Sequence, residues 1–225
     1  MDWHQQLFHY CERGLDPTFW AEPFNAITNG AFFIAALAAG IEFRRKFSPQ
    51  HSDGNGSAVA VVALIALTVM IGTGSFLFHT TATRWAMMMD SGAIAVFTVS
   101  YLGFALRRFA HAPWVVVILC MGAMFAAVAA SARLPCDPEL LPVTAAAGRA
   151  CLNGSIGYVP VLVAMVLVGL WQAFQGHPAA RLILTAAAIF FVSLALRTLD
   201  LELCTQTALL GKTRGTHGAW HLLNG

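Results

Sequence analysis

The stretch AVAVVALIALTVMIGTGSFLFH, residues 58–79, carries no charged side chain before its final histidine. An apolar run of this length is typical of a helix that crosses a lipid bilayer, which takes about 20 residues. Ser75 and His79 stand about one helical turn apart near the end of the run, so their side chains leave the same face of that helix. The stretch therefore predicts a transmembrane helix with polar groups at one end.

The whole chain has the same apolar character. Of its 225 residues, 58% are hydrophobic and 11% are charged, and the mean hydropathy is +0.67. This composition is far from that of a soluble domain and indicates a polytopic membrane protein. The net charge is only +2 and the basic residues are scattered, so we expect no nucleic-acid partner.

We expect an all-α integral membrane protein, a seven-transmembrane-helix bundle that forms a single domain over 1–225. The N-terminal segment 1–23 is expected to lie outside the membrane. A seventh helix begins at about 216 and reaches Gly225, so we expect it to be cut short there or only to dip into the bilayer. The six complete spans are expected at roughly 24–43, 58–79, 85–106, 114–132, 156–174 and 180–196.

Basic clusters set the expected orientation of the bundle. Residues 44–46 and 107–108 are Lys or Arg and directly follow the first and third spans, so the positive-inside rule places these loops in the cytoplasm. The N-terminus then lies on the non-cytoplasmic side. The end of the second span, the start of the third and the start of the seventh lie there too, so the notable polar groups are expected at that membrane face.

Three histidines are candidate metal ligands. His217 and His221, in the stretch HGAWH, share one helical face, and His79 is expected at the same depth of the bundle. Three neutral imidazoles bind zinc and leave its fourth position to water, as in catalytic zinc sites. Ionisable groups at membrane depth usually face a cavity or one another, which favours a site at this place.

Two further polar residues suit hydrolysis of an amide or ester. Zinc lowers the pKa of bound water towards about 7, which supplies hydroxide at neutral pH. Asp90, about one turn into the third span, is placed to accept the water's proton and pass it to a leaving group. Ser75 is placed to donate a hydrogen bond to a developing oxyanion.

Other interpretations of the same residues remain open. An intramembrane histidine often serves as a hydrogen-bonding contact between helices, and a small residue such as Ser75 often serves packing. Histidines on membrane helices also bind haem in electron carriers. A ligand-sensing receptor that uses zinc only to hold its helices together is a third alternative.

Several quoted motifs together resemble the alkaline ceramidases, within a wider group of seven-helix membrane hydrolases that includes the adiponectin receptors. The sequence has GSFLFH at 74–79, followed by Asp90 and, far downstream, HGAWH at 217–221. YCERGLDPTFWAEPFNAITN at 10–29 and RTLDLELC at 197–204 are also similar to that family. The resemblance covers nearly the whole chain.

The resemblance implies a zinc-dependent hydrolase of membrane lipids. Zinc would be bound by His79, His217 and His221, with Asp90 as proton shuttle and Ser75 as oxyanion donor. The substrate would be ceramide or another N-acyl lipid drawn from the bilayer, and the products a fatty acid and a sphingoid base.

The resemblance also implies a calcium site in the N-terminal segment, where the match is partial. Glu12 and Glu22 correspond to family carboxylates, whereas His9 and Gly14 stand where the family has Asp and Asn. Calcium takes six to eight oxygen ligands, so Asp16 and backbone carbonyls would have to replace the missing side chains.

Four of the five cysteines, at 11, 136, 151 and 204, are disulfide candidates if their loops face an oxidising compartment. The resemblance implies that Cys11 pairs with Cys204.

Overall fold

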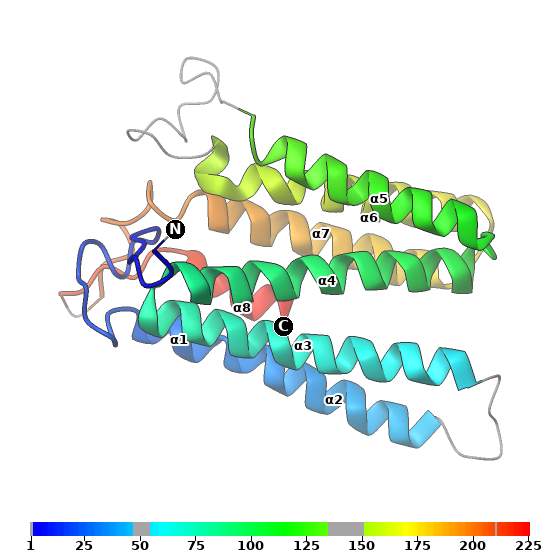
Figure 1. Cartoon of the computed structure of the whole chain (residues 1–225), viewed down its shortest axis with the longest axis horizontal. Coiled ribbons are helices and arrows are strands. Elements are labelled where there is room, and N and C mark those ends of the chain that lie inside the picture. The colour runs from blue at the N-terminus through cyan, green and yellow to red at the C-terminus, as the bar shows by residue number, and fades with distance from the viewer. Residues whose placement is uncertain (1, 47–54, 135–150, 210) are drawn as a thin grey trace.

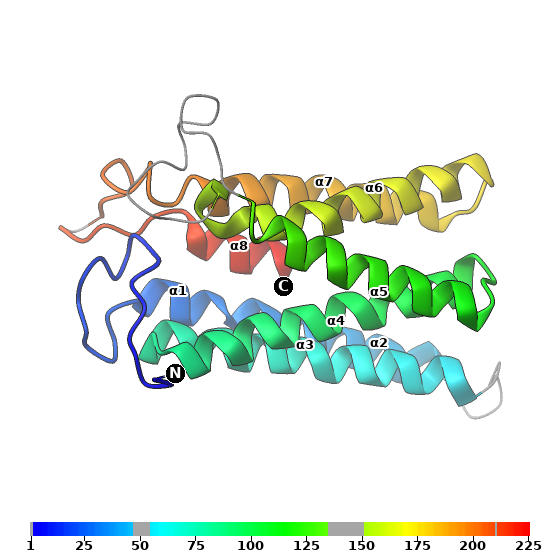
Figure 2. The same cartoon turned by 45° about the horizontal axis from the view of Figure 1, so that its top comes forward.

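The computed structural model describes residues 2–46, 55–134, 151–209 and 211–225. Within these ranges the chain is helical and forms no sheet. Long helices run side by side along the longest axis of the molecule, and α8 lies among them (Figures 1 and 2). The elements are α1 (Pro23–Thr28), α2 (Gly30–Lys46), α3 (Asn55–Thr81), α4 (Arg84–Phe109), α5 (Trp114–Ser131), the 3-10 helix η3 (Cys151–Tyr158), α6 (Val159–Phe174), α7 (Ala179–Thr198) and α8 (His217–Asn224).

Six helical stretches are long and apolar enough to cross a membrane, and they overlap the six complete spans expected from the sequence. Large apolar side chains on their outer faces are exposed, and Leu37 and Phe174 are among the most exposed of them. Such surfaces suit lipid rather than water. The described fold is therefore all-helical, with six candidate membrane spans and with α8 as a short additional helix inside the bundle.

The first expected span, 24–43, is interrupted. α1 ends at Thr28 and α2 begins at Gly30, with Asn29 between them. The Asn29 side chain is completely buried, and its Nδ2 donates to the carbonyl of Asn25 at 2.9 Å. An asparagine side chain that bonds to nearby backbone competes with regular helix, which explains the break.

Helices α3 and α4 approach each other backbone to backbone at Gly74. A Cβ atom at this position would lie 3.0 Å from the Asp90 nitrogen and from Met89 backbone atoms, so no side chain fits there without a shift. The close approach brings Ser75, the next residue of α3, to the same level of the bundle as Asp90 on α4.

The N-terminal segment covers the end of the bundle where α3 turns into α4. The Leu7 N–H donates to the Ala82 carbonyl at 2.7 Å, and the Arg84 N–H donates to the Gln5 carbonyl at 3.0 Å. Figure 1 shows this segment at the same end of the molecule as the connection from α7 to α8.

A disulfide joins Cys11 of the N-terminal segment to Cys204 after α7, which is the pairing that the resemblance implies. The two residues are 193 positions apart in the sequence. The bond therefore ties the segment that precedes α1 to the connection that leads into α8. Cys136 lies outside the described residues.

Replacing Cys204 with serine is expected to destabilise the fold by about 2–5 kcal/mol, because the disulfide closes a very long loop in the unfolded chain. Thermal unfolding of the purified protein in detergent measures the effect. Cys120→Ser is the matched control, since Cys120 is a free thiol. Equal melting temperatures for Cys204→Ser and the parent would contradict the structural role of the disulfide.

Candidate metal centre

The three candidate histidines lie together inside the bundle. His79 comes from the end of α3, and His217 and His221 come from α8. One ring nitrogen of each lies within 4.8 Å of the corresponding atoms of the other two. All three side chains are almost completely buried. Among the described residues, this is the one group of three or more His, Cys, Asp or Glu side chains with the geometry to bind a metal ion.

Glu22 orients the ring of His79. Its Oε2 lies 2.5 Å from His79 Nδ1, so this nitrogen carries the proton and donates it to the carboxylate. His79 Nε2 is buried without a hydrogen-bond partner. A buried polar atom without a partner is costly, whereas a lone pair facing a metal ion is satisfied. The carboxylate–histidine contact therefore leaves Nε2 free to bind metal.

Thr28, at the end of α1, orients the ring of His221 in the same way. The Thr28 hydroxyl donates to the Asn25 carbonyl at 2.9 Å, so its oxygen accepts the proton of His221 Nδ1, also at 2.9 Å. The lone pair of His221 Nε2 then points away from Thr28. The last residue of α1 thus contacts α8 directly.

Asp200 and Tyr10 fix the position of His217. Asp200 Oδ1 accepts the backbone N–H groups of Thr216 and His217, both at 2.8 Å, and thereby caps the start of α8. The Tyr10 ring stacks on the His217 imidazole with 3.7 Å between centroids. His217 Nδ1 is a second buried ring nitrogen without a partner. A buried ring nitrogen without a partner, on an imidazole that is held in place, fits a metal site.

The Asp200 carboxylate also holds the N-terminal segment. Its Oδ2 accepts the Cys11 N–H at 2.9 Å, beside the Cys11–Cys204 disulfide. Burial raises the pKa of Asp200 above its usual value, although the three backbone N–H donors oppose the change. One carboxylate thus connects the N-terminal segment, the end of α7 and the start of α8.

Ser75 and Asp90 border the histidine cluster. Ser75 Oγ lies 3.4 Å from His221 Nε2. Asp90 Oδ1 is buried and has no hydrogen-bond partner among the described residues. Asp90 does not belong to the three-histidine group itself.

An apolar cavity of about 420 Å³ lies beside the cluster, between α2, α3, α4, α5, α6, α7 and α8. Trp220, which lies between the two α8 histidines in the sequence, lines this cavity, and so does Phe32, whose ring centroid is 6.4 Å from that of His221. The cavity is large enough for part of a lipid chain.

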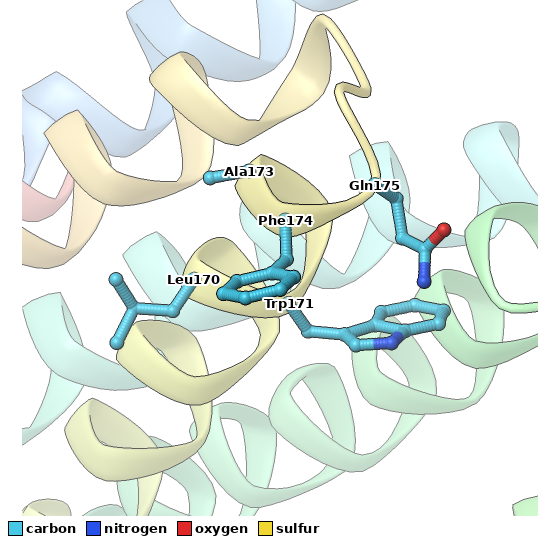
Figure 3. A pocket seen from close by; sticks show the side chains of 5 residues that line it. All are labelled: Leu170, Trp171, Ala173, Phe174 and Gln175. Carbon is cyan, nitrogen blue, oxygen red and sulfur yellow. The ribbon is translucent and has the colours of Figure 1, made fainter.

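A second hollow lies against the end of α6, away from the histidines. Figure 3 shows its five lining side chains, four from the last turns of α6 and one, Gln175, from the connection that follows. It is lined by none of the three histidines and by neither Ser75 nor Asp90, so we assign it no role in the site.

The three carboxylates expected to bind calcium have other partners. Glu12 accepts the backbone N–H groups of Phe24 and Asn25 at the start of α1, each at 2.8 Å. Glu22 pairs with Arg13 as well as with His79. Asp16 is exposed, and its Oδ1 accepts the Thr18 N–H at 2.8 Å. The described structure does not gather them into an acidic cluster, so the residues do not fit calcium.

The sequence did not reveal the residues that orient the three histidines. Arg13, Thr28 and Asp200 were not singled out, and Glu22 was assigned to calcium rather than to His79. Arg13 and Asp200 lie within the quoted stretches YCERGLDPTFWAEPFNAITN and RTLDLELC. The family resemblance of these stretches indicated that they matter. No spacing within them, however, indicated which of their residues would contact the histidines.

The bundle and its buried cluster define a class of protein: an all-helical protein with six candidate membrane spans and, inside the helices, three histidines that could hold a metal ion. The chain belongs to the ceramidase family, whose characteristic sequence matches residues 8–225. No curated protein and no solved structure matches the chain. The family assignment therefore supports a hydrolase and rests on a match over nearly the whole chain.

His217→Ala is expected to abolish metal binding, because it removes one of three ligands and leaves two imidazoles. Elemental mass spectrometry of the protein in detergent should find roughly one metal ion per chain in the parent and almost none in the variant. His4→Ala, which changes an exposed histidine of the N-terminal segment, serves as control. Full metal content in His217→Ala would remove His217 from the ligand set.

Proposed function

We propose that the protein is a zinc-dependent intramembrane hydrolase that cleaves the amide bond of ceramide-like lipids, giving a fatty acid and a sphingoid base. The observation that carries the proposal is the cluster of three buried histidines, two of which have buried ring nitrogens without partners. Membership of the ceramidase family supports the reaction and the class of substrate.

Zinc is the metal that this set of ligands suits best. Imidazole nitrogens are ordinary zinc ligands, and three of them leave one position for water or substrate, which is the pattern of catalytic zinc. His79, His217 and His221 would hold the ion. When bound, zinc polarises the amide carbonyl and lowers the pKa of a water molecule towards about 7.

Asp90 and Ser75 would carry out the remaining steps. The unpartnered Oδ1 of Asp90 takes the proton of the attacking water and delivers it to the amide nitrogen, which leaves as the amine of the sphingoid base. The Ser75 hydroxyl donates a hydrogen bond to the amide oxygen as negative charge develops there. The 3.4 Å distance between Ser75 Oγ and His221 Nε2 supports this role, because it puts the hydroxyl next to a proposed zinc ligand.

The cavity beside α8 would receive a hydrocarbon chain of the lipid. Its wall consists mainly of apolar and aromatic side chains, and Trp220 connects it directly to the two α8 histidines. An amide at the histidine cluster can therefore be reached by a substrate whose chain lies in the cavity. This arrangement favours a lipid amide over a soluble peptide.

The geometry disfavours the haem alternative. A haem places its two axial nitrogens on opposite faces of the porphyrin. In this cluster the three imidazole nitrogens lie within 4.8 Å of one another, so the third ring would occupy the space that the porphyrin plane needs. A single metal ion fits the cluster without this conflict.

We further propose that the site faces the non-cytoplasmic side of the membrane. The Cys11–Cys204 disulfide joins the N-terminal segment to the connection from α7 to α8, and both lie at the end of the bundle where α8 begins (Figure 1). Disulfides persist in oxidising compartments. The basic ends of α2 and α4 lie at the other end, as the positive-inside rule requires for cytoplasmic loops.

Asp90→Asn is expected to retain zinc and lower kcat for ceramide hydrolysis by at least about 100-fold, because the amide cannot accept the proton of water. Release of sphingoid base and zinc content, measured on the same preparation, test this. A parental rate in Asp90→Asn would show that Asp90 is not the proton shuttle. Zinc-loaded parent protein that releases no product would favour the receptor with structural zinc.

A further inference from the structure

The guanidinium of Arg13 lies at the centre of the N-terminal segment, where the calcium ion was expected. Its side chain is fully buried and surrounded by oxygen acceptors. Nε donates to Glu22 Oε1 at 2.6 Å. The two terminal nitrogens donate to four backbone carbonyls, those of Asp16 at 3.1 Å, Thr18 at 2.9 Å, His79 at 3.0 Å and Thr80 at 3.3 Å.

Carboxylate and carbonyl oxygens from three separate segments are the kind of ligands that hold calcium in proteins. In this segment a planar guanidinium uses the same kind of oxygens, because its five N–H donors reach several acceptors at once. The Glu22 carboxylate compensates the buried positive charge of Arg13, so neither charge is left unpaired in the interior. The guanidinium of Arg13 therefore occupies the position at which a calcium ion was expected.

Arg13 also acts on the metal centre through Glu22. The Arg13–Glu22 pair presents Glu22 Oε2 to His79 Nδ1, which leaves His79 Nε2 free for metal. Arg13 further binds the carbonyls of His79 and Thr80 in the last turn of α3, where the helix dipole favours a cation. Both the side chain and the backbone of His79 are thus held by one network.

We propose that Arg13 is a positioning residue that replaces calcium: it fixes the N-terminal segment without a metal ion and holds Glu22 against His79. The protein accordingly needs no calcium for stability or for zinc binding. This proposal rests on the zinc site of the proposed function. Zinc affinity and calcium binding are both measured without substrate. A result that contradicts the role of Arg13 can therefore be told apart from a result that contradicts lipid hydrolysis.

Calcium titration of the parent protein tests the first part. In calcium-depleted buffer with zinc bound, the melting temperature should stay unchanged as calcium is raised to about 1 mM, the weak end of protein calcium sites. Equilibrium dialysis with radioactive calcium should show no bound ion over that range. Saturable binding, or a rise in melting temperature with calcium, would overturn the replacement of calcium by Arg13.

Substitution of Arg13 tests the second part. Arg13→Met should weaken zinc binding by about 10–100-fold, the usual cost of losing a group that orients a ligand. Arg13→Lys should lie between this variant and the parent, because it keeps the charge but has fewer donors. Competition with a zinc chelator measures affinity. Arg84→Met is the matched control, since Arg84 contacts Gln5 of the same segment but not Glu22.

A double variant separates positioning from general loss of stability. If Arg13 acts largely through Glu22, Arg13→Met combined with Glu22→Gln should weaken zinc binding by clearly less than the sum of the two single losses, because both changes break the same Arg13–Glu22–His79 contact. Additive losses in the double variant, or parental zinc affinity in Arg13→Met, would contradict the positioning role. Should Arg13→Met fail to fold, Arg13→Lys and the calcium titration of the parent still decide the proposal.

Discussion

The contact between Glu22 and His79 is the interaction on which the proposed metal centre depends. It lies entirely inside the protein and determines which imidazole nitrogen of His79 is left without a proton. Arg13 holds Glu22 from the other side, and Asp200 and Thr28 hold α8, so each histidine is oriented by a residue outside its own helix. The N-terminal segment is consequently part of the site rather than a cover over it.

The helices were predictable because apolar length is a local property of the sequence. The runs that define α3 to α7 are visible without any knowledge of the fold. The interruption at Asn29 was not, since its cause is a side-chain bond to the Asn25 carbonyl within an otherwise apolar stretch. The path of the N-terminal segment over the α3–α4 turn also depends on contacts that no local pattern reveals.

The grouping of the three histidines was predictable from spacing together with the family resemblance, whereas the residues that orient them were not. His217 and His221 lie on one helical face, and this can be read directly from the sequence. The partner of His79 lies 57 positions away, and the contact between Asp200 and Cys11 spans 189. Polar contacts over such distances appear only once the chain has folded. Arg13 also explains why the expected calcium ligands have other roles, because its N–H groups bond to oxygens that a calcium ion would need.

The most direct test of the central claim is X-ray absorption at the zinc edge of the purified, zinc-loaded protein. Three buried histidines acting as ligands predict a shell of three imidazole nitrogens and one oxygen at about 2.0–2.1 Å, with no sulfur. That spectrum would establish the site that the contacts of His79, His217 and His221 describe. A shell with fewer imidazoles, or one dominated by carboxylate oxygens, would contradict a three-histidine metal centre.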